Sequence, residues 1–330
     1  MPLLHMENLA VSFATEAGRL RAVEDVSVTV NRGETLGLVG ESGCGKSVTA
    51  LSIMRLLPKP SGRIEAGRIQ FDGIDITALA PDAMHTIRGR RIAMIFQEPM
   101  TALNPVHTIG KQVCEIFHLH PQTLPAGAGR KESAEQAEEM LRKVGIPDPR
   151  RRMKEYPHQI SGGMRQRVMI AMALACSPDL LIADEPTTAL DVTIQAQILD
   201  LIKNAQSETG MAVIFITHDL GVIAETCERV CVMYAGKIVE TADVRTLFQR
   251  PAHPYTRGLL DSIPRLENRR KSRLSIIPGM VPALGEFPPG CRFQNRCGRM
   301  QDICSDKDPL LEPVGKEHMT SCHFPVKQAQ

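Results

Sequence analysis

Eight consecutive residues near the N-terminus have the composition of a loop that binds phosphate groups. Residues 40–47 read GESGCGKS, which fits the pattern GxxxxGK[ST] in full. Glycines let backbone N–H groups curl around phosphate oxygens, and the start of a helix adds partial positive charge. Lys46 is expected to reach the β- and γ-phosphates and the Ser47 hydroxyl to bind Mg²⁺. The segment predicts a nucleoside-triphosphate site.

Two adjacent acids later in the chain supply groups that hydrolysis of a triphosphate needs. Residues 180–185 read LLIADE, a short apolar strand that ends in carboxylates. Asp184 would orient the Mg²⁺ shell, and Glu185 would accept a proton from an attacking water. Two acids at a strand end can also be solvated loop residues. The complete phosphate loop upstream favours the catalytic interpretation.

A second anion-binding segment lies between these two. Residues 160–167 read ISGGMRQR and open an apolar helix, so Ser161, Gly162 and Gly163 stand at a helix N-terminus. One nucleotide needs only one phosphate-binding loop, so this second anion-binding segment would serve a nucleotide held by another subunit. Taken alone, Ser161 is also explained as a helix N-cap.

The hydrophobic pattern predicts strands alternating with helices, which is typical of an α/β fold with a largely parallel sheet. Asp72-Gly73 predicts a hairpin between strands at 69–71 and 74–76. The other expected strands cover 26–30, 35–39, 92–96, 180–183 and 212–216, and the expected helices cover 46–57, 134–144, 163–175 and 192–208.

Two regions differ from this alternation. Residues 98–178 contain mainly helical patterns and are expected to form a helical subdomain. The last 80 residues hold ten of the 23 prolines and four of the nine cysteines, which predicts a loop-rich appendage.

Composition excludes several classes of protein. The chain has 330 residues and a formal net charge of +2, too balanced to indicate nucleic-acid binding by charge alone. Nine phenylalanines, three tyrosines and no tryptophan make a base-stacking platform improbable. The longest apolar run, Val168 to Cys176, has nine residues against the ~20 of a membrane-spanning helix. The N-terminus lacks the features of a signal peptide, so the cysteines are expected as thiols or metal ligands.

The motifs together resemble the ATP-binding subunit of ABC transporters. They follow that family's order: phosphate loop, Gln97 after a strand, Ser-Gly-Gly, Asp184-Glu185, Asp191 in Ala-Leu-Asp, and His218 after a strand. Ser161 and Asp184 are 23 residues apart, and Glu185 and His218 are 33 apart. The resemblance covers residues 1–250 and implies a P-loop NTPase fold with an N-terminal β subdomain and the helical subdomain at 98–178.

The resemblance also implies roles for the matching residues. Gln97 would contact Mg²⁺ and the water, His218 the γ-phosphate, and Asp191 the opposite subunit of a dimer. Phe13 would stack on adenine, although a single Phe is also compatible with a core position. The implied catalytic residues are Glu185, His218, Lys46 and Gln97, and the implied Mg²⁺ contacts are Ser47, Gln97 and Asp184. The implied contacts to ATP are Phe13, Gly40, Glu41, Ser42, Gly43, Cys44, Gly45, Lys46, Ser47, Val48, Ser161, Gly162, Gly163 and Asp191.

Further segments resemble the dipeptide and oligopeptide importers within that family. These are RPAHPYT at 250–256 with Leu259-Leu260, YPHQ at 156–159 and MTALNP at 100–105. The resemblance implies an importer-type domain at 251–330 and a peripheral location on the cytoplasmic face of a bacterial inner membrane. The implied partners are a second ATPase subunit, expected to be a paralogue, two transmembrane permeases and an extracytoplasmic peptide-binding protein.

Four cysteines in the appendage have the chemistry of a metal site. Cys291, Cys297, Cys304 and Cys322 are separated by five, six and seventeen residues and lack CxxC pairs. Thiolates suit both zinc and iron–sulfur clusters, and unliganded thiols remain a third interpretation. The resemblance to peptide importers implies a 4Fe–4S cluster.

Other functions compatible with the sequence are a nickel or glutathione importer ATPase and a soluble ABC ATPase that acts on nucleic acid or ribosomes. The balanced charge and the single cassette argue against the latter. A P-loop kinase or GTPase leaves Ser161-Gly162-Gly163 unexplained.

Overall fold

The computed structural model describes residues 1–97, 102–125, 129–188, 191–263 and 276–326. The chain forms two compact units. The first contains Met1–Val30, Thr35–Thr77 and Phe215 onwards, and the second contains Asn31–Glu34 and Ala78–Ile214.

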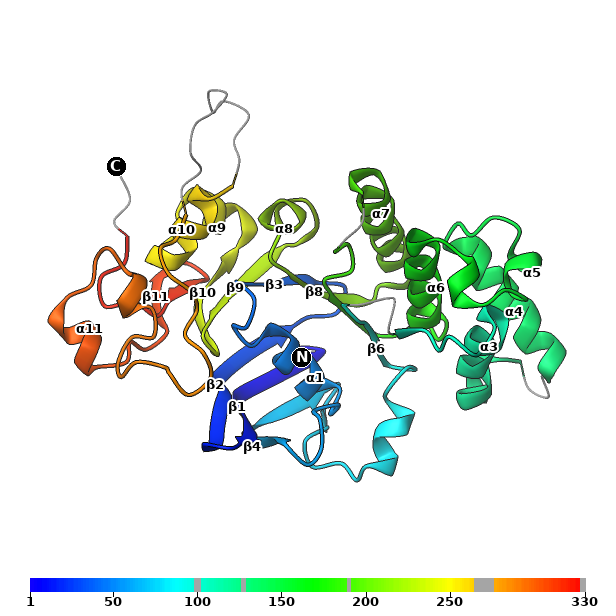
Figure 1. Cartoon of the computed structure of the whole chain (residues 1–330), viewed down its shortest axis with the longest axis horizontal. Helices are drawn as coiled ribbons and strands as arrows, with labels where there is room; N and C mark the ends of the chain where they lie inside the picture. The colour runs from blue at the N-terminus through cyan, green and yellow to red at the C-terminus, as the bar shows by residue number, and fades with distance from the viewer. Residues whose placement is uncertain (98–101, 126–128, 189–190, 264–275, 327–330) are drawn as a thin grey trace. The chain divides into compact units, whose positions relative to one another are not determined.

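The N-terminal sheet of the first unit is antiparallel, with strand order β2-β1-β4-β5 (Figure 1). It consists of β1 (Leu4–Thr15), β2 (Gly18–Val30), β4 (Gly62–Phe71) and β5 (Ile74–Asp75). Val26, Val28 and Val30 are buried while their neighbours are more exposed, as the period of a half-buried strand requires. Phe71 pairs with Ile74, which confirms the predicted hairpin.

The second sheet of this unit joins the centre of the chain to its C-terminal region. Its strands are β3 (Thr35–Val39), β9 (Arg229–Tyr234), β10 (Lys237–Asp243), β11 (Glu312–Gly315) and β12 (His318–Thr320). The order is β11-β12-β10-β9-β3, with β3 parallel to β9 and the remaining pairs antiparallel. The C-terminal hairpin therefore extends the sheet that carries the phosphate loop (Figure 1).

The first unit also contains short helices. They are α1 (Lys46–Ile53), α8 (Leu220–Thr226), α9 (Val244–Gln249), α10 (Pro254–Asp261), α11 (Asp302–Asp306) and a 3₁₀ turn, η4 (Gln294–Arg296). Helix α1 ends earlier than the predicted residue 57, because Arg55 adopts a left-handed φ of 51° that a helix cannot continue.

The second unit contains buried strands and a group of helices. Its strands are β6 (Ile92–Ile95) and β7 (Leu180–Asp184), which are parallel. It also contains residues 212–214 of β8, a strand that covers Ala212–Thr217 in full. Its helices are α3 (Ile109–Leu119), α4 (Arg130–Lys143), α5 (Pro149–Arg152), α6 (Gly162–Leu174) and α7 (Val192–Thr209), with 3₁₀ turns η1 (Asp82–Thr86), η2 (Pro121–Thr123) and η3 (Pro157–Gln159).

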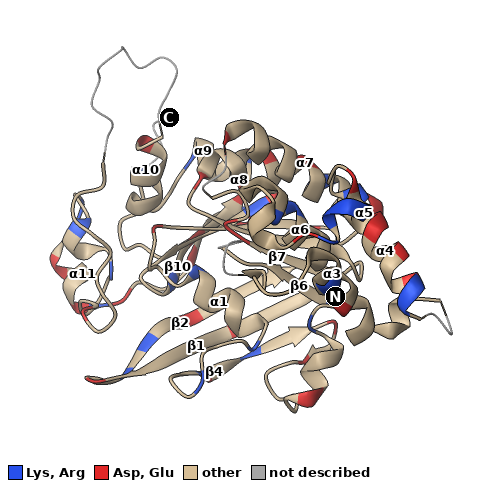
Figure 2. Ribbon diagram, turned by 45° about the vertical axis from the view of Figure 1, so that its right-hand side comes forward, with Lys and Arg blue, Asp and Glu red and all other residues tan. Residues whose placement is uncertain are grey.

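Helices α3, α4 and α6 pack on one another in this unit. Ser133, Ala137 and Leu141 recur every four residues along α4 and are buried, whereas most of the exposed residues of α4 are charged (Figure 2). Phe96, predicted to end a buried strand, follows β6 and is 40% exposed. In the described ranges, no helix is both long and apolar enough to span a membrane.

Candidate nucleotide site

The phosphate loop connects β3 to α1 in the first unit, as the sequence predicts. Gly40, Gly43 and Gly45 have φ values of 155°, 80° and 106°. A Cβ at Gly40 would lie 2.2 Å from the Met233 carbonyl oxygen, so the loop approaches β9 more closely than any side chain allows. No side chain caps α1, whose N-cap is Gly45. The first N–H groups of α1 are therefore suited to an anionic ligand.

Lys46 folds back over this loop. Its Nζ donates to the carbonyl oxygens of Gly40 at 2.7 Å and Glu41 at 3.0 Å, and the residue is 5% exposed. Cys44 is fully buried, and burial raises the pKa of its thiol. Ser47 and Val48 follow in the first turn of α1, while Ser42 and Gly43 are exposed.

The predicted base and Gln97 come together in the second unit. All residues of β7 are buried, and Asp184 is its last residue. Glu185 follows with φ 48°, a left-handed conformation that costs a non-glycine residue about 1–2 kcal/mol. Glu185 Oε2 accepts hydrogen bonds from Gln97 Nε2 at 3.2 Å and Thr188 Oγ1 at 2.8 Å. These bonds fix the direction of the carboxylate.

The Ser-Gly-Gly segment begins α6, also in the second unit. Ser161 is the N-cap, and its Oγ accepts from the Met164 N–H at 3.3 Å. The N-cap role is thus confirmed, and it leaves the exposed Ser161 and Gly162 at a helix N-terminus. Asp191 caps α7 in the same way, accepting from the Ile194 N–H at 2.9 Å. Ala189 and Leu190 lie outside the described residues.

Two further predicted contacts belong to the first unit. His218 directly follows β8 and is exposed. Phe13 is half-buried on β1, and a Cβ at Gly62 of β4 would lie 2.9 Å from its ring. The packing of Phe13 against Gly62 supports a structural role for this side chain.

The four C-terminal cysteines line one small pocket, together with His253, Phe293 and Phe324. Burial and, to a smaller extent, the charges of the other three thiolates raise the pKa of Cys291 to about 11. Within the described ranges, no three His, Cys, Asp or Glu side chains are arranged to hold a metal ion. Thiolates are ligands of both zinc and iron–sulfur sites, and the four thiols share this one pocket.

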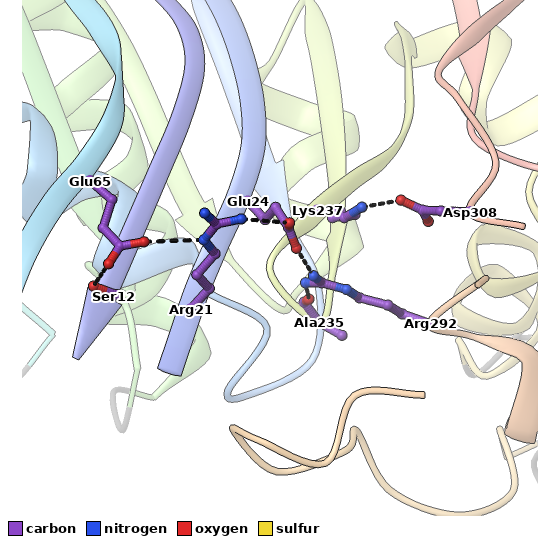
Figure 3. Close-up of polar contacts among 8 residues, drawn as sticks. All are labelled: Ser12, Arg21, Glu24, Glu65, Ala235, Lys237, Arg292 and Asp308. Atoms are coloured by element: carbon purple, nitrogen blue, oxygen red, sulfur yellow. Dashed lines mark hydrogen bonds and ion pairs between the residues drawn. The ribbon is translucent and has the colours of Figure 1, made fainter. Parts of the chain in front are cut away.

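Charged residues join the C-terminal region to the N-terminal sheet. Arg292 donates to Glu24 and to the Ala235 carbonyl, and Lys237 pairs with Asp308 (Figure 3). Across β2, β1 and β4 the network continues from Glu24 through Arg21 and Glu65 to Ser12. No spacing in the sequence indicates these contacts, because Arg292 and Glu24 are 268 positions apart.

Contacts of the same region reach the phosphate loop and were also missed by sequence reasoning. Arg296 pairs with Glu41, and the Tyr255 hydroxyl accepts from the Glu41 N–H. Tyr255 lies in the RPAHPYT segment, whose resemblance to peptide importers does not indicate a contact with the loop.

The fold and these motifs define an ATP-binding cassette. A dimeric ATP-binding cassette, solved in a post-hydrolysis state bound to ADP and Pi, has a TM-score of 0.65 and 28% identity; the match covers 73% of this chain and 99% of that one. The protein cbiO1 of Clostridium perfringens, part of the ABC transporter complex cbiONQ, has a TM-score of 0.62 and 25% identity; the match covers 76% of this chain and 91% of that one.

The chain belongs to the ABC transporter family, whose profile matches residues 23–188. A second profile, the C-terminal region of oligopeptide/dipeptide transporters, matches residues 239–304. A probable peptide ABC transporter ATP-binding protein of Sinorhizobium fredii is 55% identical over 97% of this chain and 94% of its own length. The dipeptide transport ATP-binding proteins DppD of Bacillus subtilis and Escherichia coli are 50% and 45% identical; they cover 99% and 100% of this chain, and 96% and 98% of their own lengths.

Proposed function

We propose that the chain is the ATP-hydrolysing subunit of an ABC importer for di- or oligopeptides. The observation that carries this proposal is the match of residues 239–304 to the oligopeptide/dipeptide transporter C-terminal region. A cassette alone is common to many transporters, whereas this C-terminal match distinguishes the peptide group. Relatives named for peptide transport cover nearly the whole chain at 45–55% identity.

In this proposal the nucleotide is bound between two ATPase subunits. The phosphate loop and Lys46 bind the phosphates of one ATP, and Ser161, Gly162 and Gly163 of the opposite subunit close over it. Ser47, Asp184 and Gln97 would hold Mg²⁺, which would supply neutralisation of charge on the phosphates. Phe13 stacks on the adenine, and Asp191 communicates between the subunits.

Hydrolysis then requires a base and charge stabilisation. Glu185 takes the proton of the attacking water, and its bond to Gln97 keeps the carboxylate aimed. Lys46 and His218 stabilise the charge on the transferring phosphoryl group. Closure of the two ATPase subunits turns two membrane permeases, hydrolysis resets them, and an extracytoplasmic binding protein delivers the peptide. The chain would lie on the cytoplasmic face of the membrane.

The ATPase activity of the purified complex tests this function. The chain is co-expressed with two permeases and a second ATPase subunit, and hydrolysis is measured with and without peptide-loaded binding protein. We expect stimulation by the loaded binding protein and loss of activity in Lys46→Ala. Co-purification with nucleic acid or ribosomes, with no effect of peptide, would refute the importer assignment.

We further propose that Cys291, Cys297, Cys304 and Cys322 hold a 4Fe–4S cluster. Four thiols that line one pocket support this proposal. The pKa values of Cys291, Cys297 and Cys322 are raised by burial, so binding of a metal would have to release their protons. Iron and acid-labile sulfide are measured on protein purified without oxygen. About four irons and four sulfides per chain, lost in Cys297→Ser, are expected. One zinc and no sulfide would overturn the cluster but leave the ATPase intact.

A further inference from the structure

Arg296 of the C-terminal region forms a two-pronged ion pair with the phosphate loop. Its Nη1 lies 2.7 Å from Glu41 Oε2, and its Nη2 lies 3.0 Å from Glu41 Oε1. The Arg296 side chain is only 4% exposed, and that of Glu41 is 33% exposed. Paired charge-assisted bonds of this geometry are strong and directional. The contact therefore fixes the orientation of Glu41 as well as its position.

Arg296 is itself held from several sides. Its Nε donates to the Pro278 carbonyl at 2.8 Å, and its guanidinium lies 5.7 Å from the centre of the Tyr234 ring and 6.0 Å from that of Phe293. These contacts come from the C-terminal segment and from β9. A guanidinium restrained in this way loses little freedom when it holds the loop.

A second contact from the same region holds the backbone of Glu41. The Glu41 N–H donates to Tyr255 Oη at 2.8 Å. Tyr255 is fully buried, with its ring centre 4.7 Å from that of Tyr234 and 5.4 Å from that of Phe293. The aromatic cluster Tyr234, Tyr255 and Phe293 therefore forms a rigid base for the loop.

Glu41 connects these contacts to the phosphate-binding lysine. The Glu41 carbonyl accepts from Lys46 Nζ at 3.0 Å, beside the bond from Lys46 to Gly40. The contacts thus run from Arg296 through Glu41 to Lys46. A glycine-rich loop is costly to order, and restraint before binding lowers that cost at the moment when phosphate binds.

We propose that Arg296 is a positioning residue of the nucleotide site: through Glu41 it holds the phosphate loop ready for ATP, so that the C-terminal region sets the affinity for nucleotide. This inference rests on the proposed function, since it assigns a control to the same ATP site. Cys297 directly follows Arg296 and lines the cysteine pocket. We therefore expect a change at Cys297 to reach the loop through Arg296.

Binding of a fluorescent, non-hydrolysable ATP analogue with Mg²⁺ to the full chain tests the inference. We expect Arg296→Ala to raise the Kd about tenfold, which corresponds to about 1.4 kcal/mol. The Kd of Arg296→Lys should lie between the values of Arg296→Ala and the parent, because an ammonium group cannot form two parallel bonds to a carboxylate. The matched control Lys307→Ala removes an exposed cation from the same region and should leave the Kd unchanged.

The affinity and the number of binding sites separate positioning from folding. A merely structural role would lower the sites per chain and leave the Kd of the folded fraction unchanged, and that result would overturn the inference. If Arg296→Ala does not fold, Glu41→Gln weakens the same pair from the loop side. A Kd within twofold of the parent in a folded Glu41→Gln chain would also overturn it. Failure of the parent chain to bind the analogue would refute the nucleotide site itself.

A double-mutant cycle tests the path of the coupling. Arg296→Ala and Glu41→Gln together should raise the Kd no more than the stronger single change, because both remove one contact. Cys297→Ser should raise the Kd in the parent background and have little further effect in Arg296→Ala. An equal effect of Cys297→Ser in both backgrounds would show that the coupling does not pass through Arg296.

Discussion

Replacement of Glu185 by glutamine separates the chemistry of the predicted base from its structural contacts. Gln97 Nε2 and Thr188 Oγ1 both donate to the same carboxylate oxygen, Oε2. An amide oxygen in that place can accept both bonds, so Glu185→Gln keeps the local geometry. We expect the free energy of unfolding to change by less than about 1 kcal/mol, the net value of one hydrogen bond.

We expect Glu185→Gln to lower the rate of ATP hydrolysis instead of the stability of the fold. An amide cannot accept the proton of the attacking water, and general bases contribute about 10²–10⁴ in rate. This corresponds to about 2.7–5.4 kcal/mol of the activation barrier. Steady-state phosphate release and binding of Mg²⁺-ATP are measured on the same preparations. We expect binding to be retained, hydrolysis to fall by at least a hundredfold, and ATP to trap a closed dimer.

Glu225→Gln serves as the matched control, because it makes the same chemical change at an exposed residue on α8. Undiminished hydrolysis in Glu185→Gln would refute its assignment as the base. A loss of ATP binding equal to the loss of rate would show that the carboxylate serves nucleotide binding instead.

Three further predictions concern the first unit. Gly40→Ala should abolish nucleotide binding, because its Cβ would lie 2.2 Å from a carbonyl oxygen. Gly43→Ala has no atom within 4 Å of its Cβ and should cost only the strain of a positive φ, about 1–2 kcal/mol. Calorimetry and nucleotide binding measure the two effects. Burial lowers the pKa of His253 to about 4, so the unfolded chain, with an ordinary pKa of 6.5, takes up the proton first as pH falls. Stability is complete above pH 6.5 and should fall by about 2 kcal/mol between pH 7 and pH 5 in urea titrations. His253→Asn, which keeps an acceptor for the Tyr255 N–H, should lose this pH dependence, and an unchanged slope would contradict the assignment. Cys44, buried and with a raised thiol pKa, should react with a maleimide only after unfolding; rapid alkylation of the folded chain would contradict its burial.

The sequence predicts best where function depends on local geometry. The phosphate loop needs glycines at fixed spacing before a helix, so GESGCGKS identifies the loop, its strand and α1 together. The hairpin at Asp72-Gly73 is predicted for the same reason. The end of α1 is set by the positive φ of Arg55, and nothing in the composition near Arg55 indicates that angle.

Contacts between distant segments could not be predicted from patterns. Arg296 and Glu41 are 255 positions apart, and each taken alone is an ordinary surface charge. Their pairing depends on the C-terminal hairpin joining β10 and on three aromatic residues packing together. The only indication in the sequence is the RPAHPYT segment, which contains Tyr255. Its resemblance to peptide importers gives no physical reason for a contact with the phosphate loop.

Uptake of a labelled dipeptide into sealed vesicles tests the central proposal most directly. The vesicles contain the permeases, this chain and its partner ATPase, with the binding protein and peptide on one side and Mg²⁺-ATP on the other. We expect peptide to accumulate against its gradient with the parent chain and not with Lys46→Ala or Glu185→Gln. Accumulation that continues unchanged in Lys46→Ala, or hydrolysis of ATP with no movement of any peptide tested, would contradict the proposal.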